Sequence, residues 1–193
     1  MHIECFQHFS QIKDEEQKAY KFYNELDNDQ GISILDDLKS YSAIRSWITK
    51  NESKLILAKL VRNINLIISD YPENPKKRCR EINYWMNEQI KKCNNKCETS
   101  LSSDSSTVFN DIKWNRVNND IVCKRETVPY PTKDIDLMKE LDNYCEFRNN
   151  LRCDKFQYEE ELLKYNTYIK EKRQHFRIYA CKIHNKTLQE KKI

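Results

Sequence analysis

Glycine is nearly absent from this chain. Its 193 residues include one glycine, Gly31, and four prolines. Tight hairpins and phosphate-binding loops need glycine where φ is positive or where the backbone must approach a ligand closely. The sequence contains neither GxGxxG nor GxxxxGK[ST], the motifs of dinucleotide- and nucleotide-binding loops. The composition therefore argues against nucleotide-binding α/β folds and favours helices.

The chain also contains no long apolar run. No stretch of 18 apolar residues occurs, so we expect no segment of this sequence to span a bilayer. The first residues do not show the charged-then-apolar pattern of a secretory signal. An aromatic content of 11% is too high for a disordered chain. The length predicts a single domain over residues 1–193.

The charge is weak and well mixed. The formal net charge is +4, from 34 basic and 30 acidic residues. Nucleic-acid binding needs a more basic domain with a recognisable module, so we expect no nucleic-acid partner. The basic run Lys76–Arg78 is interpreted as a solvated helix face.

Apolar residues recur at helical spacing along most of the chain. The pattern predicts helices over residues 10–27, 32–47, 49–68, 75–97, 108–121, 134–149 and 155–186. Between them, the Ser-rich segment 98–107 and the Pro-containing segment 124–133 are predicted to be flexible loops. The predicted fold is all-α, a disulfide-linked bundle of about six or seven helices.

Local signals mark some helix boundaries. Gly31 is expected to take a left-handed conformation that ends the first helix. Thr49 and Glu52 have the spacing of a capping box, in which each side chain satisfies a free backbone N–H. The stretch Leu55–Ile68 is apolar nearly all round, so it is predicted to be the central helix.

Cysteine is the residue type that most needs explaining. The eight cysteines are Cys5, Cys79, Cys93, Cys97, Cys123, Cys145, Cys153 and Cys181. Because most lie on or beside predicted helices, we favour disulfides that join helices. A full set of eight allows 105 pairings, and the sequence cannot choose among them. Cys93 and Cys97 lie one helical turn apart, and each is expected to reach a different partner.

Two other interpretations of the cysteines stay open. Structural zinc needs paired C-x2-C or H-x3-H units, whereas the closest pair here is C-x3-C without a second pair. Reduced cysteines in an intracellular protein are the other alternative, although eight in 193 residues is many for that class.

No catalytic set is recognisable. Cys181 precedes His184 by three residues, a spacing that arises often by chance on a helix and does not define a nucleophile and base. The acidic run Glu159–Glu161 is interpreted as a solvated helix face. We therefore predict no enzyme activity, no cofactor, no metal and no small-molecule substrate.

The stretch CREINYWMNEQI resembles the Cys-x-x-Leu-Asn-Tyr-Trp-Leu signature of the Plasmodium interspersed repeat (PIR) proteins, the family that includes the Vir variant antigens. Cys79, Asn83, Tyr84 and Trp85 match as they stand, and Ile82 replaces the usual leucine. Cys79, Cys93 and Cys97 recur at helical spacing and are expected on one stripe of a helix. Trp85 lies beside this stripe and is expected to pack in the core.

Weaker similarities to the same family extend along the chain. The stretch KELDNYCEFRNNL, with Cys145, resembles a second family block, and Cys153 and Cys181 resemble the closing cysteines. The start of the chain, with Cys5 and Phe9, also fits.

The resemblance implies the extracellular helical domain of an exported variant surface antigen. Family members are exported, many of them to the membrane of the infected red cell, and are linked to adhesion and immune evasion, so the implied partner is a host protein or cell-surface receptor. Many carry a transmembrane helix, so we expect membrane attachment through a segment outside this chain. The sequence does not identify the binding residues; the loops and adjoining helix surfaces are our interpretation. An intracellular helical adaptor with reduced cysteines remains the alternative.

Overall fold

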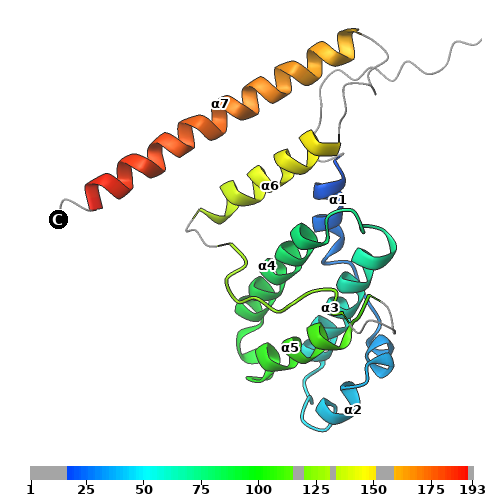
Figure 1. Cartoon of the computed structure of the whole chain (residues 1–193). Helices are drawn as coiled ribbons and strands as arrows, with labels where there is room; N and C mark the ends of the chain where they lie inside the picture. Colours follow the sequence, from blue (N-terminus) through cyan, green and yellow to red (C-terminus); the bar gives the residue numbers. More distant parts are fainter. Residues whose placement is uncertain (1–16, 115–119, 131–133, 151–158, 191–193) are drawn as a thin grey trace, which may run out of the picture. The chain divides into compact units, whose positions relative to one another are not determined.

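The computed structural model describes residues 17–114, 120–130, 134–150 and 159–190, which are mostly helical (Figure 1). Within these residues no β-strand occurs, and one isolated bridge pairs Lys113 with Ile121. The predicted all-α fold is confirmed. By its contacts the chain forms two compact units, Lys21–Ile135 and Asp136–Ile193 with Met1–Tyr20. The single domain expected over 1–193 stays a prediction.

The larger unit, Lys21–Ile135, contains most of the short helices. Its elements are α1 (Lys18–Glu25, which begins just before the unit), the 3-10 helix η2 (Ile32–Asp37), α2 (Tyr41–Ile44), α3 (Asn51–Ser69), α4 (Pro75–Cys93), the 3-10 helix η3 (Asn94–Lys96) and α5 (Leu101–Asp111).

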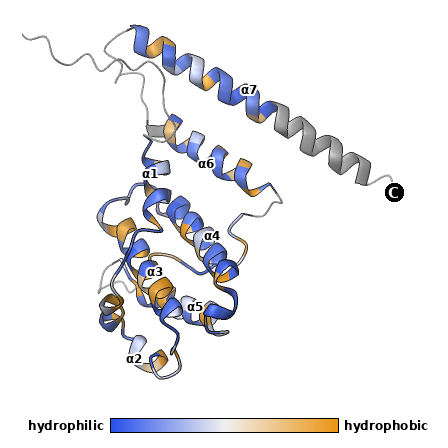
Figure 2. Cartoon of the chain, turned by 180° about the vertical axis from the view of Figure 1, so that it is seen from behind, coloured by the Kyte–Doolittle hydropathy of each residue, from blue (hydrophilic) through white to orange (hydrophobic). Residues whose placement is uncertain are grey.

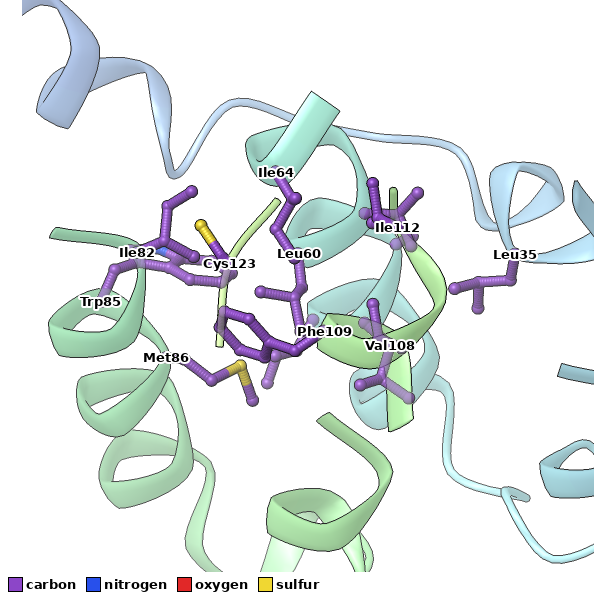
Figure 3. Close-up of a cluster of buried hydrophobic side chains, with 14 of the residues drawn as sticks. Leu35, Leu60, Ile64, Ile82, Trp85, Met86, Val108, Phe109, Ile112 and Cys123 are labelled. Carbon is purple, nitrogen blue, oxygen red and sulfur yellow. The ribbon is translucent and has the colours of Figure 1, made fainter. Parts of the chain in front are cut away.

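Helix α3 is the centre of this unit, as its apolar sequence predicted. It packs against η2, α4 and α5, and Leu57, Leu60, Ile64 and Ile67 are fully buried. Figure 3 shows Leu60 beside Phe109 of α5 and facing the side chains of α4. Burying one such side chain stabilises the fold by about 1.5–3 kcal/mol, so α3 contributes substantially to core stability.

The Ser-rich segment is a helix, not the loop predicted over 98–107. Helix α5 covers Leu101–Asp111. The helix predicted over 108–121 does not continue through 112–114 or 120–121, and 115–119 lie outside the described residues. Hydroxyl groups of the serines donate to carbonyls one turn earlier, as Ser105 does to Ser102 at 2.7 Å. The buried residues Leu101, Val108 and Phe109 then hold the helix against the core, so packing overrides the weak helix propensity of serine.

The helix predicted over 32–47 is divided into η2 and α2. Between them, Leu38 adopts an extended conformation with φ −82° and ψ 131°. The Asp111 carboxylate at the end of α5 accepts a hydrogen bond from the Ser40 backbone N–H at 2.8 Å and another from the Ser40 hydroxyl. A long-range cap on Ser40 therefore begins a new helix where local periodicity predicted a continuous one.

Two predicted boundary signals are also wrong. Gly31 has φ −66° and ψ 142°, an extended conformation, and precedes η2 instead of ending α1 in a left-handed turn. The N-cap of α3 is Lys50, and no capping bond joins Thr49 to Glu52. Thr49 instead donates its backbone N–H and its hydroxyl to Glu98, at 2.8 and 2.9 Å.

The second unit contains α6 (Ile135–Asn150) and α7 (Glu159–Glu190). The helix predicted over 134–149 agrees with α6, and that predicted over 155–186 agrees with α7 where the structure describes it. Tyr144, Tyr165 and Ile169 form a small buried cluster, and Lys172 of α7 bonds Glu140 of α6 at 2.8 Å. Hydrophilic residues dominate the coloured part of α7 (Figure 2).

Candidate binding surface beside the cysteine-linked loop

A disulfide joins Cys79 of α4 to Cys123, which lies 44 residues later in the chain (Cα–Cα 5.4 Å). Cys123 belongs to the segment 120–130, which we call the clamped loop. The yellow-green ribbon of this loop runs back alongside α4 in Figure 1. Residues 124–130 form neither helix nor strand, which agrees with the loop predicted over 124–133, and 131–133 lie outside the described residues. The predicted flexibility of this loop stays a prediction.

A second disulfide joins Cys93 to Cys97 (Cα–Cα 5.6 Å). This corrects the prediction that each of these cysteines would reach a different partner. Helix α4 ends at Cys93, and Asn94 then has φ 42°, in the left-handed region that asparagine tolerates. Because the chain turns there, Cys97 returns to the side of Cys93 instead of continuing along a helix.

The remaining cysteines are placed less fully. Cys5 and Cys153 lie outside the described residues, as does the side chain of Cys181. Cys145 is half-buried and forms no disulfide with the other described cysteines. Disulfides at these four positions stay predictions.

The side chain of Asn83 holds the clamped loop to α4. Its Nδ2 donates to the carbonyl oxygens of Cys79 and Lys124, both at 2.9 Å. Its Oδ1 accepts from the Glu126 backbone N–H at 2.7 Å and from Arg125 at 2.9 Å. With a relative exposure of 1%, Asn83 is a buried amide whose hydrogen-bonding capacity is used in full.

Asn87 extends this contact by one helical turn. Its Nδ2 donates to the Thr127 carbonyl at 2.9 Å, and its Oδ1 accepts from Arg125 Nη2 at 2.6 Å. Cys79, Asn83 and Asn87 thus form one stripe of α4, spaced by four residues. Sequence reasoning identified Cys79 and Asn83 but missed Asn87, although its spacing was a signal.

Arg125 links the clamped loop to α5 as well as to α4. Its guanidinium carbon lies 5.9 Å from the centre of the Phe109 ring, a cation–π distance. Burial lowers the pKa of Arg125, but an arginine remains charged at neutral pH.

The aromatic pair of the signature has two different roles. Trp85 is 2% exposed and donates Nε1–H to Asp27 at 2.8 Å, so its predicted core packing is confirmed (Figure 3). Tyr84 is half-buried and meets the ring of Tyr130 edge to face, with centroids 6.1 Å apart.

Residues of the clamped loop line two pockets. The first, which we call the aromatic pocket, measures about 410 Å³ and is lined by Tyr84, Ile90 and Tyr130 among others. The second, the basic pocket, measures about 510 Å³ and is lined by Lys76, Arg80, Trp114 and Lys124 among others. Val128 is 69% exposed beside them. The loop therefore presents side chains to two hollows and to solvent.

The basic run at the start of α4 is not the solvated face that the sequence indicated. Lys77 and Arg78 are each 1% exposed. Both bond the buried Glu81, Lys77 at 2.5 Å and Arg78 at 3.1 Å. The Arg78 guanidinium also lies 5.0 Å from the centre of the Phe22 ring. Only Lys76 of this run is exposed.

Among the described residues, no group of three or more histidine, cysteine, aspartate or glutamate side chains is arranged to hold a metal ion. Nor does any helix in the same part of the chain combine the length and apolar character that a bilayer-spanning helix needs.

The comparisons with known proteins agree with the resemblance noted in the sequence. A family model described as Plasmodium vivax Vir protein matches residues 17–192. No curated protein and no solved structure matches the chain. The matched range includes α4, both disulfides and the clamped loop.

Proposed function

Because this chain belongs to the Plasmodium vivax Vir protein family, we propose that it forms the extracellular domain of an exported variant surface antigen. On this proposal the domain lies at the surface of the infected red cell, where it binds a host protein or cell-surface receptor and contributes to adhesion and immune evasion. Its role is recognition, without catalysis.

The observation that carries the proposal is the way the clamped loop is attached. Asn83 and Asn87 bond three main-chain groups of the loop: the Lys124 carbonyl, the Glu126 N–H and the Thr127 carbonyl. Main-chain groups are the same for every residue type except proline, and of the loop side chains Arg125 joins in these bonds. Exposed loop residues can therefore change while the loop keeps its course, which suits an antigen that varies.

The disulfides support the extracellular location. Two disulfides, at Cys79–Cys123 and Cys93–Cys97, hold four of the eight cysteines. Bridges of this kind form and persist in oxidising compartments and are rare in reducing ones.

A receptor screen tests the binding proposal. The folded chain is applied to an array of purified host cell-surface ectodomains, beside a variant with Lys124→Ser, Thr127→Ser and Val128→Ser. These three side chains are exposed, so the variant keeps the main-chain bonds and the fold. We expect a receptor that binds the native chain and does not bind the variant. Binding that the variant retains would exclude the clamped loop as the contact surface.

Titration of free thiols in denaturant tests the proposed extracellular location. The proposal expects at least four of the eight cysteines to be unreactive before reduction. Eight reactive thiols in protein from its native source would instead favour an intracellular helical adaptor.

A further inference from the structure

Positively charged side chains line the basic pocket, and the proposed function gives them no role. Lys76, Arg80 and Lys124 line it together with one acidic residue, Glu126. Lys76 and Lys124 are both exposed. Cations gathered around a hollow raise the local concentration of anions. The pocket therefore favours a negatively charged ligand.

The same pocket has an aromatic wall and an apolar floor. Trp114 is half-buried and lines the hollow, and its hydrophobic part packs against the core. Pro75, Val122 and the Cys79 half of the disulfide form the remaining apolar lining. A ligand that fills the hollow must therefore offer an apolar face as well as a negative charge.

The shape is fixed by the clamped loop. Val122 and Lys124 lie on either side of Cys123, which the disulfide holds to α4. The Lys124 carbonyl accepts the bond from Asn83 at 2.9 Å. A volume of about 510 Å³ lies in the range of small-ligand pockets, and a preformed pocket loses little entropy on binding.

We propose that the basic pocket binds a saccharide that carries a carboxylate or a sulfate group. The C–H face of a pyranose ring would lie against Trp114, and the anionic group would face Lys76 and Lys124. A free inorganic anion would leave the aromatic wall unused. An acidic peptide would need a longer groove with main-chain partners, whereas this site is a single hollow. Saccharide binding goes beyond the proposed function, because it needs no host protein.

Calorimetric titration of the purified, disulfide-bonded chain tests the proposal. The probes are sucrose octasulfate against sucrose, and glucuronic acid against glucose. Inorganic sulfate and a short polyglutamate peptide are titrated under the same conditions. We expect saturable binding of one charged saccharide per chain, weakened by added salt, and no binding of its neutral counterpart.

Variants then locate the bound saccharide. Lys76→Glu and Lys124→Glu are each expected to weaken binding at least about tenfold, since hydrogen bonds to charged groups are the stronger class. Trp114→Leu is expected to weaken it as well, and Trp114→Phe to retain most of it. The matched control is Lys92→Glu, which makes the same charge change at an exposed residue of α4 outside the pocket.

Several results would overturn the proposal. These are no binding of either charged saccharide, equal binding of inorganic sulfate alone, and equal binding of polyglutamate. An equal loss of affinity in Lys92→Glu would show attraction by overall charge instead of by the pocket. Circular dichroism of each variant confirms that it is folded, with Lys76→Glu as the decisive one if Trp114→Leu unfolds. None of these results affects the receptor screen, so failure of one proposal is distinguishable from failure of the other.

Discussion

The carboxylate of Glu98 lies 2.8 Å from the backbone nitrogen of Thr49, although 49 residues separate the two in the chain. The same oxygen is 2.8 Å from the backbone nitrogen of Lys50. Glu98 therefore caps α3 from outside the helix, and it connects the segment after the Cys93–Cys97 disulfide to the central helix of the larger unit.

Replacing Glu98 with glutamine should lower the melting temperature by on the order of 3 °C at neutral pH. The variant loses the negative charge that accepts the N–H groups at the start of α3. The matched control is Glu52→Gln, because Glu52 is the residue that a local capping box would use. Thermal melts followed by circular dichroism should show little change for Glu52→Gln. A larger effect at Glu52 than at Glu98 would contradict the structure.

The effect of Glu98 should also depend on pH. Hydrogen bonds from the backbone N–H of Lys50, and then from the backbone N–H and the hydroxyl of Thr49, hold the pKa of Glu98 below its ordinary value of 4.5. A carboxyl group with a lower pKa in the folded state stabilises the fold above its unfolded pKa, and this contribution is lost as the pH falls through the folded pKa. The difference in melting temperature between the native chain and Glu98→Gln should therefore be constant near neutral pH. It should shrink below about pH 4.5. A difference that does not change with pH would exclude a charged cap.

Local sequence signals predicted the long helices well but could not predict contacts between distant residues. The central position of α3 followed from its apolar pattern. The division between η2 and α2 depends on Asp111, which is 71 residues from Ser40. No periodicity or capping rule includes a partner at that separation.

The Ser-rich helix and the buried charges were missed for different reasons. Serine favours turns because its hydroxyl competes for backbone groups, but in α5 the hydroxyls bond within the helix and the apolar residues pack. For Lys77, composition indicated solvent, although Glu81 four residues later was a visible partner. In the candidate binding surface, Cys79, Asn83 and a loop over 124–133 followed from the sequence, whereas the pairing of Cys79 with Cys123 and the bonds from α4 to the loop did not.

Asn83 of α4 should be the most sensitive of the polar residues that hold the clamped loop. Asn83→Ala removes a buried side-chain amide. The Glu126 N–H and the Lys124 carbonyl then lose the hydrogen-bond partner that this amide provides. We expect a loss of about 2–3 kcal/mol in the free energy of unfolding, measured by urea denaturation with the disulfides intact. The matched control, Asn87→Ala, is half-buried and should cost about 1 kcal/mol. Equal losses would contradict a clamp centred on Asn83.

Glu81 should be essential to the fold because it accepts bonds from two buried cations. Glu81→Gln is expected to cost about 3–5 kcal/mol, since it removes the negative partner of Lys77 and Arg78 from a buried site. The double variant Lys77→Met with Glu81→Gln should be less destabilised than Glu81→Gln alone, because one buried charge is then gone. Urea denaturation of the two single variants and the double variant measures this coupling. Additive losses would show that the Lys77–Glu81 bond contributes little.

The two disulfides should differ in what they contribute to stability. A disulfide stabilises mainly by restricting the unfolded chain, and the effect grows with the length of the loop that it closes. Cys79 and Cys123 are 44 residues apart, whereas Cys93 and Cys97 are four apart. Replacing Cys79 and Cys123 together with serine should therefore cost about 4 kcal/mol, and replacing Cys93 and Cys97 together about 2 kcal/mol.

Each paired serine variant is the control for the other, because both remove one disulfide and add two hydroxyls. The variant at Cys79 and Cys123 should also weaken saccharide binding at the basic pocket, since Lys124 is next to Cys123 and Cys79 lines the pocket. The variant at Cys93 and Cys97 should leave that binding unchanged, because neither residue lines the pocket. Urea denaturation and calorimetric titration of the same two proteins measure both effects. If the variant at Cys79 and Cys123 kept its saccharide binding, the disulfide between the clamped loop and α4 would not be what holds the pocket in shape.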